Sequence, residues 1–308
     1  MMESQVDREL LEKIADLIGK PVGAFNIRKD TGCDGRQSTE NIQITSKTDG
    51  KSGIDIRIKD GTKGEQCHIP VIITKPGIQE LVYNDFYIGE NCDVDIVAGC
   101  GIHNTGCETA QHDGLHTFYI GKNSKVRYVE RHYGEGDGMG ENIMNPTTVV
   151  EMDEDSYLEM ETTQIKGVDS TVRTTKATLG SRATLIIKEK VMTHGKQLAK
   201  SDFTVDLNGE DCHTNVISRS VARDQSHQVF LARINGNARC YGHSECDAII
   251  MDQGVVAAIP EVTANCVDAS LVHEAAIGKI AGEQLIKLMT LGLTEKEAEE
   301  QIVKGFLK

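Results

Sequence analysis

Residues 179–187 read Leu179-Gly180-Ser181-Arg182-Ala183-Thr184-Leu185-Ile186-Ile187, a turn followed at once by a run of aliphatic and β-branched residues. The glycine and the polar residues after it are typical of a tight corner, and the run that follows is typical of a strand. A similar corner, Ile-Gly-Lys-Asn-Ser, occupies residues 120–124. Corners of one pattern indicate that a short structural unit recurs along the chain.

Short strand-like runs continue from about Ile54 to about Pro260, separated by Gly, Asn and Asp. Several alternate between apolar and polar residues, as at 54–58 and 203–207, which predicts strands with one buried face. No helical pattern of useful length lies between them, so a doubly wound α/β sheet is not expected. The absence of Trp and an aromatic content of 4% favour a thin aliphatic core. The irregular spacing of the corners leaves a sandwich, a barrel and a β-helix open.

An amphipathic helix is predicted near the start of the chain. Gly19 closes it and Pro21 prevents its continuation. Residues 22–50 are polar and rich in turn formers, so a loop region is expected there. The apolar face of the helix consists of Leu10, Leu11, Ile14, Leu17 and Ile18.

Two further amphipathic helices are predicted at the end of the chain. The first carries Leu285, Leu288 and Met289 on one face and stops at Gly292. The second begins with a capping box, in which the Thr294 hydroxyl accepts from a backbone amide and Glu297 reaches back. Its apolar face consists of Ala298, Ile302 and Phe306.

The net charge indicates which classes of partner the protein can bind, and the cysteine content indicates the cellular compartment in which it is found. With 47 acidic and 33 basic residues the formal net charge is -14, which repels nucleic acid and anionic lipid but admits basic proteins and metal ions. The first twenty residues contain no apolar signal segment, and no apolar run is long enough for a membrane span. Nine cysteines without a signal segment predict a reducing, cytoplasmic location, and an odd number fits a disulfide framework poorly.

Thiol, imidazole and carboxylate groups gather near the end of the chain. Cys240, His243 and Cys246 lie within seven residues, and His273 and Glu274 are adjacent. Thiolate and imidazole are ligands that soft and borderline metals prefer. The spacing is not that of a zinc knuckle, and the metalloprotease motif fails because the fourth residue after His273 is isoleucine. The pattern alone is equally compatible with buried thiols and two solvated polar residues.

A second constellation comprises Cys100, His103, Cys107, His112 and His116. This density fits a metal site, a place that receives sulfur, or a polar rim rich in turns. One hypothesis for this constellation is the metal site of a metal-dependent enzyme, such as a hydrolase. The chain contains no GxxxxGK[ST] motif, so any ATP-driven step is expected to come from a partner.

The segment from Asp202 to Lys308 resembles the C-terminal core of the SufB/SufD family, the scaffold subunits of iron–sulfur cluster assembly. The resemblance rests on Cys246-Asp-Ala, on His273-Glu274-Ala and on Gly-Lys-Ile at 278–280, and it weakens upstream. It implies an all-β fold, a right-handed parallel β-helix with short helical regions at both ends. The implied organisation is a helical and loop region at 1–50, a β-helix core at 51–271, and a helical region at 272–308 that docks an ATPase subunit.

The resemblance also implies a function. The chain is expected to be a scaffold without enzyme activity of its own, holding a transient iron–sulfur cluster, of [4Fe-4S] type, through Cys246, Glu274 and His273. Replacing thiolates with carboxylate or imidazole is expected to weaken the bonds to iron, which suits a cluster that must be released. Lower-ranked candidates for ligation or sulfur transfer are Cys266, Cys240, His243, Cys100, His103 and Cys107.

The implied partners are a SufC-like ABC ATPase, a sulfur donor, apo-protein acceptors, and either a second copy of the chain or a SufD-like paralogue. A two-fold pair would bring the same patch together from both copies. The resemblance also allows a flavin cofactor, which some relatives use. The alternatives are a SufD-like subunit that holds no cluster alone, the metal-dependent enzyme at Cys100–His116, and a purely structural β-solenoid with buried cysteines.

Overall fold

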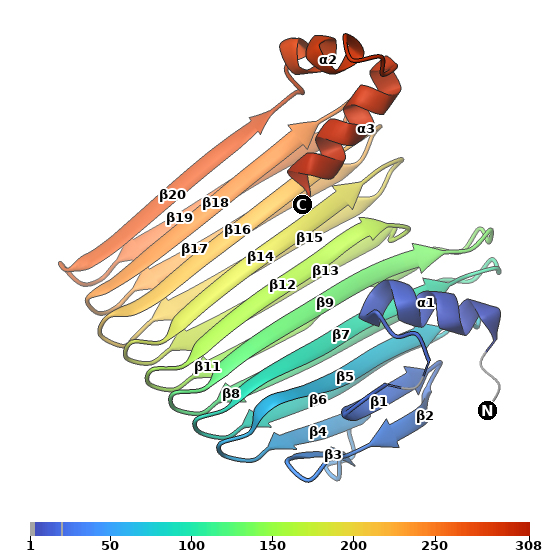
Figure 1. Cartoon of the computed structure of the whole chain (residues 1–308). Helices are drawn as coiled ribbons and strands as arrows, with labels where there is room; N and C mark the ends of the chain where they lie inside the picture. The colour runs from blue at the N-terminus through green and yellow to red at the C-terminus, as the bar shows by residue number, and fades with distance from the viewer. Residues whose placement is uncertain (1–3, 20) are drawn as a thin grey trace.

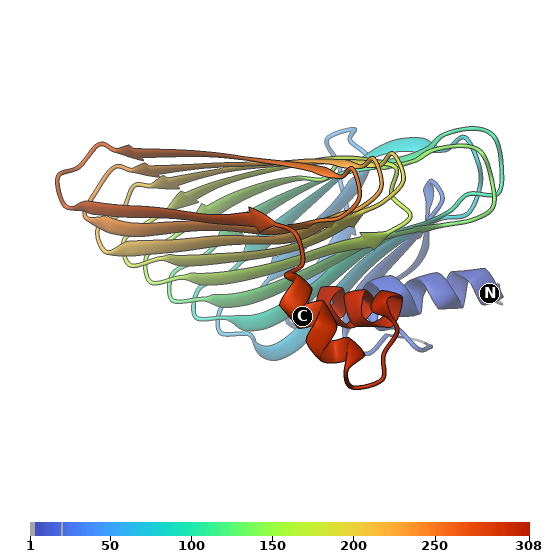
Figure 2. The same cartoon turned by 90° about the horizontal axis from the view of Figure 1, so that it is seen from above.

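The computed structural model describes residues 4–19 and 21–308, and over these residues the chain forms a parallel β-helix flanked by short helices (Figure 1; Figure 2). The β-helix expected from the resemblance is therefore confirmed. Two long sheets face each other, and from β4 onward the chain passes back and forth between them, so that one strand from each sheet makes a coil. Pairing within both sheets is parallel except for β1 with β2 and β3 with β4, at the N-terminal end.

The first sheet, called sheet A, has the order β2 (Gly32–Gln37), β1 (Ala24–Lys29), β5 (Lys63–Ile73), β7 (Asp93–His103), β9 (Lys125–Glu135), β12 (Tyr157–Lys166), β14 (Thr184–Thr193), β16 (Cys212–Ala222), β18 (Cys240–Ile250) and β20 (Ala269–Gly278). The second, sheet B, has the order β19 (Val255–Ala264), β17 (His227–Gly236), β15 (Leu198–Leu207), β13 (Ser170–Leu179), β10 (Asn142–Met144), β8 (Ala110–Ile120), β6 (Gln79–Ile88), β4 (Gly53–Ile58) and β3 (Ile42–Ser46). A further strand, β11 (Thr147–Met152), continues after β10 and pairs with both β13 and β8.

The predicted corners are the turns between successive strands. Asn123 and Arg182 adopt left-handed backbone conformations there, with φ of 54° and 57°. Most other non-glycine residues with positive φ in the described chain are Asp or Asn, whose short polar side chains tolerate this conformation best. The Gly, Asn and Asp residues that separate the strand-like runs in the sequence are therefore the residues that turn the chain.

The interior of the β-helix has an apolar half and a polar half. Along β14, Leu185, Ile187 and Glu189 point inward in succession because alternate residues of a strand share a face. The same change from apolar to polar occurs along β9, where Tyr128 precedes Glu130. Polar side chains are thus stacked on one another inside the fold, coil after coil.

Helix α1 (Gln5–Ala15) packs on the outer face of sheet A, over β5, β7 and β9 (Figure 1). Gly99 permits this approach, since a Cβ atom there would lie 2.7 Å from the backbone oxygen of Ile14. The helix ends at Ala15, with Asp16 in the left-handed conformation. The expectation that the helical face extends to Ile18 was wrong, because that side chain lies beyond the end of the helix and is 86% exposed.

The expected boundaries differ from the ends of the strands. Residues 22–50, expected to be a loop region, contain β1, β2 and β3, and β20 continues past residue 271 to Gly278. Strand β2, Gly-Cys-Asp-Gly-Arg-Gln, has little intrinsic strand preference, and its antiparallel pairing with β1 imposes the strand.

Helices α2 (Gly282–Met289) and α3 (Glu295–Phe306) follow the last strand, and the predicted capping box of Thr294 and Glu297 is confirmed. Helix α3 packs on the β-helix: its Val303, and Leu307 directly after the helix, form one buried apolar cluster with Val221 of β16. Within the described chain, no helix has the length and apolar character needed to cross a bilayer.

Candidate functional site

Cys246 lies on β18 and points into the β-helix, where it is 1% exposed. Its neighbours in register are Ser218 on β16 and Ala275 on β20. Burial raises the pKa of the Cys246 thiol to about 12, and the nearby charges of Glu189 and Asp247 act in the same direction. The thiol is therefore protonated at neutral pH, although the thiolate is the form that binds metals and attacks sulfur.

His273 lies on the same inner face, on the last strand of sheet A. Its partner in register is Ser244, two residues before Cys246 on β18. The Nδ1 atom of His273 and the Oγ atom of Ser244 are buried and have no hydrogen-bond partner among the described residues. Unsatisfied buried polar atoms are rare and call for an explanation, such as a missing ligand. Cys246, Ser244 and His273 together form a group that we call the inner C-terminal site.

Glu274 faces the other way. It pairs in register with Glu245 on the outer face of sheet A, and its Oε2 lies 3.7 Å from Nε2 of His243. Nδ1 of His243 is within 3.0 Å of Oδ1 of Asn215. Burial, together with a hydrogen bond to Asp247, raises the pKa of the Glu245 carboxyl. The structure thus joins Cys246 with His273 and His243 with Glu274, but it places Cys246 and Glu274 on opposite faces of sheet A.

The C-terminal end of the β-helix is open. After β20 the chain leaves for α2, so no further coil covers β19 and β20 (Figure 1). Exposed apolar side chains on these two strands are Val255, Ile259, Val262, Val272 and Ile277. The two strands therefore have unpaired edges as well as exposed apolar side chains, a combination that in general favours strand pairing.

The other C-terminal thiols lie at a corner rather than beside Cys246. Cys240 is in register with Cys212, and Cys266 is in the turn between β19 and β20, near enough for its charge to affect Cys240. Burial raises the pKa of Cys212 to about 11 and also raises the pKa of Cys240. Cys240 begins β18, so it is six residues, or roughly 20 Å along the strand, from Cys246.

The constellation at Cys100–His116 is divided by the fold. Cys100, His112 and His116 are buried and line a small internal cavity together with Glu130 and His132. Nδ1 of His103 approaches Glu135 at 3.4 Å, and Cys107 is exposed in the loop between β7 and β8. Across residues 4–19 and 21–308, no three His, Cys, Asp or Glu side chains are grouped so as to hold a metal ion.

A ladder of inward-facing polar side chains connects the middle of the β-helix with Cys246. Glu130, Thr162, Glu189, Ser218 and Cys246 occupy the same level of sheet A in successive coils. Neighbouring strands lie about 4.8 Å apart, so the ladder spans roughly 19 Å. Its last member is the thiol of the inner C-terminal site.

Arg173 of β13 crosses the interior from sheet B and pairs with both carboxylates of this ladder. Its Nη1 lies 2.6 Å from Oε2 of Glu130, and its Nε lies 3.7 Å from Oε1 of Glu189. Glu189 also accepts hydrogen bonds from Ser201 at 2.5 Å and from Ser218 at 2.8 Å. Burial opposes ionisation of Glu130, but the charge of Arg173, the charge and hydrogen bond of His132 and the charge of His116 together outweigh it and hold the pKa of that carboxyl well below its usual range. Charge is therefore maintained inside the fold.

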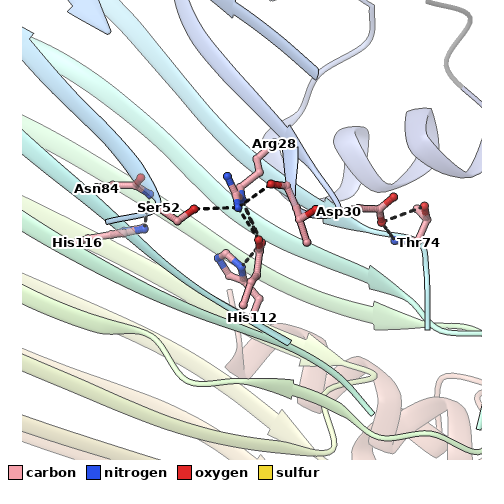
Figure 3. A network of polar contacts seen from close by, with 9 residues as sticks. Arg28, Asp30, Ser52, Thr74, Asn84, His112 and His116 are labelled. Atoms are coloured by element: carbon pink, nitrogen blue, oxygen red, sulfur yellow. Dashed lines mark hydrogen bonds and ion pairs between the residues drawn. The ribbon is translucent and has the colours of Figure 1, made fainter. Parts of the chain in front are cut away.

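A directional hydrogen-bond chain ends on the same carboxylate. Burial lowers the pKa of His116 to about 4, so the ring is neutral at pH 7. Its Nε2 lies 3.2 Å from Nδ2 of Asn84 and accepts from it (Figure 3), which leaves Nδ1 to donate to the Tyr128 hydroxyl at 2.8 Å. Tyr128 in turn donates to Oε1 of Glu130 at 3.1 Å. Each polar group in this chain has a partner.

The site residues predicted from the sequence did not include Glu130, Arg173, Glu189 or Ser218. A usable signal was present for Glu189, because it falls in phase with Leu185 and Ile187 in a run with period two. A charged residue in phase with buried apolar residues is itself predicted to be buried. The partner on the opposite sheet, Arg173, is likewise in phase with Ala177 and Leu179, but its pairing with Glu130 and Glu189 could not be predicted, because that contact depends on which coils face each other.

Comparison with known proteins identifies the family. Residues 82–306 match the SufBD core domain of the SUF system of FeS cluster assembly. The chain belongs to the SufBD family. This family takes part in iron–sulfur cluster assembly, and the match covers both the interior ladder and the inner C-terminal site of this SufBD protein.

Similar proteins span most of the chain. An iron–sulfur cluster assembly SufBD family protein of Methanocaldococcus jannaschii is 31% identical over 275 residues, covering 88% of this chain and 86% of that protein. A SufBD family protein of Archaeoglobus fulgidus is 28% identical, covering 89% of this chain and 73% of that protein. One from Pyrococcus horikoshii is 27% identical, with coverage of 94% and 88%.

Proposed function

We propose that this SufBD protein is a scaffold that builds a labile iron–sulfur cluster at its C-terminal end and transfers it to acceptor proteins. The observation that carries the proposal is the inner C-terminal site. There the thiol of Cys246 and the imidazole of His273, whose Nδ1 has no hydrogen-bond partner among the described residues, lie on the inner face of the last two strands of sheet A. Iron and sulfide are the substrates of this site, and a thiolate with nitrogen or carboxylate ligands suits an iron–sulfur cluster.

In the proposed mechanism, burial keeps Cys246 inactive until the last coil moves. A thiol with a pKa of about 12 is a poor ligand at neutral pH. Admission of water and iron as β20 shifts would lower that pKa and release the thiolate. The same shift is needed to bring Glu274 toward Cys246, because the two now face opposite sides of the sheet.

The proposed source of this movement is an ABC-type ATPase subunit bound to the C-terminal helices. Helix α3 packs against Ile249 on β18, three residues beyond Cys246. Helix α2 has no buried residue, and its Ile286 and the nearby Leu291 are 64% and 77% exposed. An apolar helix surface of this kind suits a partner protein, and α3 would transmit a displacement to the strand that carries Cys246.

A second copy of the chain, or a SufD-like paralogue, is proposed to cover the open end. Pairing through β19 and β20 would place the last coils of both subunits side by side. Sulfur would be supplied by a donor protein. The two upstream candidates to receive it are Cys100, which is buried inside the fold, and Cys107, which is exposed in a loop.

Anaerobic reconstitution with iron and sulfide tests the proposal. We expect the wild type to form a cluster, read by visible absorption and Mössbauer spectra, and Cys246→Ala to lose it. Cys67→Ala is a matched control, because Cys67 is also buried with a pKa raised to about 12, but it lies on β5.

A cluster that forms equally well in Cys246→Ala would contradict the assignment and point to Cys100. Failure of the wild type alone, with recovery when a SufB-type protein is added, would instead support the SufD-like alternative. His273→Ala and Glu274→Gln then separate the ligands on the two faces of sheet A.

A further inference from the structure

The N-terminal end of the β-helix contains a cavity of about 270 Å³, at the opposite end of the molecule from Cys246. Strands β1 and β2 form one wall, and residues 46–54, which join β3 to β4, form another. The inward-facing side chains of Ile69 and Asn84 belong to its floor. The cavity is thus a part of the fold that the proposed scaffold function does not use.

The lining of this cavity is basic, although the chain as a whole has a net charge of -14. Arg28, Arg36, Lys47 and Lys51 line it, and none of the described lining residues is Asp or Glu. Clefts lined by charge of one sign concentrate ions of the opposite sign. An anion is therefore the class of ligand that this cavity attracts.

Arg36 differs from the other three basic residues. Arg28 pairs with Glu80, Lys47 with two aspartates, and Lys51 approaches an aspartate at 3.8 Å. Within the described chain, Arg36 has no carboxylate partner: its Nε donates to Asn26 at 2.8 Å and its Nη1 to Ser46 at 2.9 Å. Two neutral groups thus fix the guanidinium while leaving its charge uncompensated.

Arg28 is also held in place by several hydrogen bonds, among them one from its Nη2 to Ser52 (Figure 3). Glu80 accepts from its Nε at 3.0 Å and from its Nη2 at 2.7 Å, and His112 contacts the other oxygen of Glu80 at 3.0 Å. The same Nη2 lies 3.2 Å from the hydroxyl of Ser52. These donors of Arg28 are therefore occupied, and Arg28 contributes mainly by its position. A guanidinium group that is fixed in advance but has no carboxylate partner, as at Arg36, can bind a carboxylate or phosphate without a further ordering cost.

We propose that this cavity binds a small anion bearing a carboxylate or phosphate group, with Arg36 as its principal contact. Arg28, Lys51 and the hydroxyl groups of Ser46 and Ser52 complete the site. The volume lies just below the range of roughly 300–1,000 Å³ typical of ligand pockets, so a compact metabolite fits it better than a nucleotide. The proposal is independent of the scaffold function, because it involves neither Cys246 nor the C-terminal helices.

Cys33 provides the test, because this exposed thiol belongs to the cavity lining. Its Sγ lies 3.5 Å from Oδ1 of Asn26, the atom that also accepts from Arg36. The full-length protein is alkylated with anionic iodoacetate or neutral iodoacetamide, and the rates are read at each cysteine by peptide mass spectrometry. Cys107, which is exposed outside the cavity, is the internal reference.

We expect the ratio of the iodoacetate rate to the iodoacetamide rate to be roughly threefold or more higher at Cys33 than at Cys107. Inorganic phosphate and malonate are then titrated at constant ionic strength, so that general screening does not change. Saturable protection of Cys33 from iodoacetamide by either anion supports the site, and the stronger protector identifies the preferred group. Equal ratios at the two thiols, or protection that does not saturate, would overturn the proposal.

Arg36→Gln removes the uncompensated charge but keeps a polar side chain. We expect it to lower the rate ratio at Cys33 to that of Cys107 and to weaken anion protection roughly tenfold or more. Arg57→Gln is the matched control, because Arg57 lies on β4 outside the cavity and stacks on Tyr87. Unchanged protection in Arg36→Gln, with an unchanged iodoacetamide rate at Cys33 showing that the fold is intact, would also refute the site.

Discussion

Arg173 is the only cation in direct contact with both interior carboxylates, Glu130 and Glu189, among the ion pairs of the described chain. All three side chains are at most 5% exposed. A charge buried at this depth is tolerated only with its partner, since desolvation is costly and water cannot replace the lost contact. The three groups therefore act as one unit.

Arg173→Met is expected to destabilise the protein by about 3–5 kcal/mol, because it leaves buried carboxylates without their cation. The shift of the urea unfolding midpoint measures this loss. Arg182→Met, at an exposed ion-paired arginine, should cost less than about 1 kcal/mol. If Arg173→Met were no worse than Arg182→Met, the interior charges would have to be neutral or hydrated.

His116 makes stability depend on pH. Its folded pKa, about 4, lies below the ordinary value of 6.5, so between these values the unfolded chain binds a proton that the folded chain does not. Stability should therefore fall by about 3 kcal/mol as the pH drops from 6.5 to 4. Chemical unfolding at a series of pH values should show a shallower slope in His116→Gln than in the wild type. The exposed His227→Gln is the control, and an equal change of slope in both variants would contradict the assignment.

At the scale of elements, α2 and α3 differ in how they contact the β-helix although they are adjacent. Helix α3 is anchored on the β-helix by Val303 and Leu307, whereas α2 presents Ile286 and Met289 to the outside. Deleting both helices would remove the contact with the β-helix and the exposed apolar surface at the same time. Point substitutions on the exposed side of α2 test binding of a partner without disturbing how α3 packs on the β-helix.

The double variant Ile286→Glu and Leu291→Glu is expected to lose most of its co-purification with a SufC-type ATPase, because carboxylates would be buried at the contact. Thermal stability should be unchanged, since both side chains are exposed. Met139→Glu is the control, at a residue that is 86% exposed in a distant loop. Retention of the ATPase by the double variant would remove α2 from the proposed docking surface.

The strands from about Ile54 onward, the corners and the terminal helices could be predicted from local patterns, whereas β1, β2 and β3 could not. The choice of a β-helix over a sandwich could not, because the spacing of equivalent residues is uneven. The steps along the ladder from Glu130 to Cys246 are 32, 27, 29 and 28 residues. Only register reveals that these residues lie beside one another. The opposite orientations of Cys246 and Glu274 likewise depend on how β18 and β20 are aligned.

At the scale of the molecule, the two ends of the β-helix differ. The N-terminal edges are β2 and β3, which are short antiparallel strands of six and five residues. The C-terminal edges are β19 and β20, each of ten residues with exposed apolar side chains. Short polar edges discourage pairing, and long apolar ones favour it.

Analytical ultracentrifugation is expected to show a dimer that the double variant Ile259→Lys and Val262→Lys converts to a monomer. Both side chains are about half exposed on the C-terminal edge, at 45% and 46%. Leu81→Lys is the matched control, because Leu81 is 48% exposed but lies on β6 near the other end. If the wild type were monomeric at all concentrations, pairing of two copies through β19 and β20 would be contradicted, and a different protein would have to cover this end.

The inequality of the two ends has a consequence familiar from polymer chemistry. A building block with two reactive ends grows into a fibre, and a stack of parallel strands with apolar edges at both ends would do so. A building block with one reactive end is a chain terminator: it joins once, and growth stops. With short antiparallel strands at one end and long apolar edges at the other, this protein would be monofunctional in that sense. A fold that could extend indefinitely would thereby stop at the proposed pair.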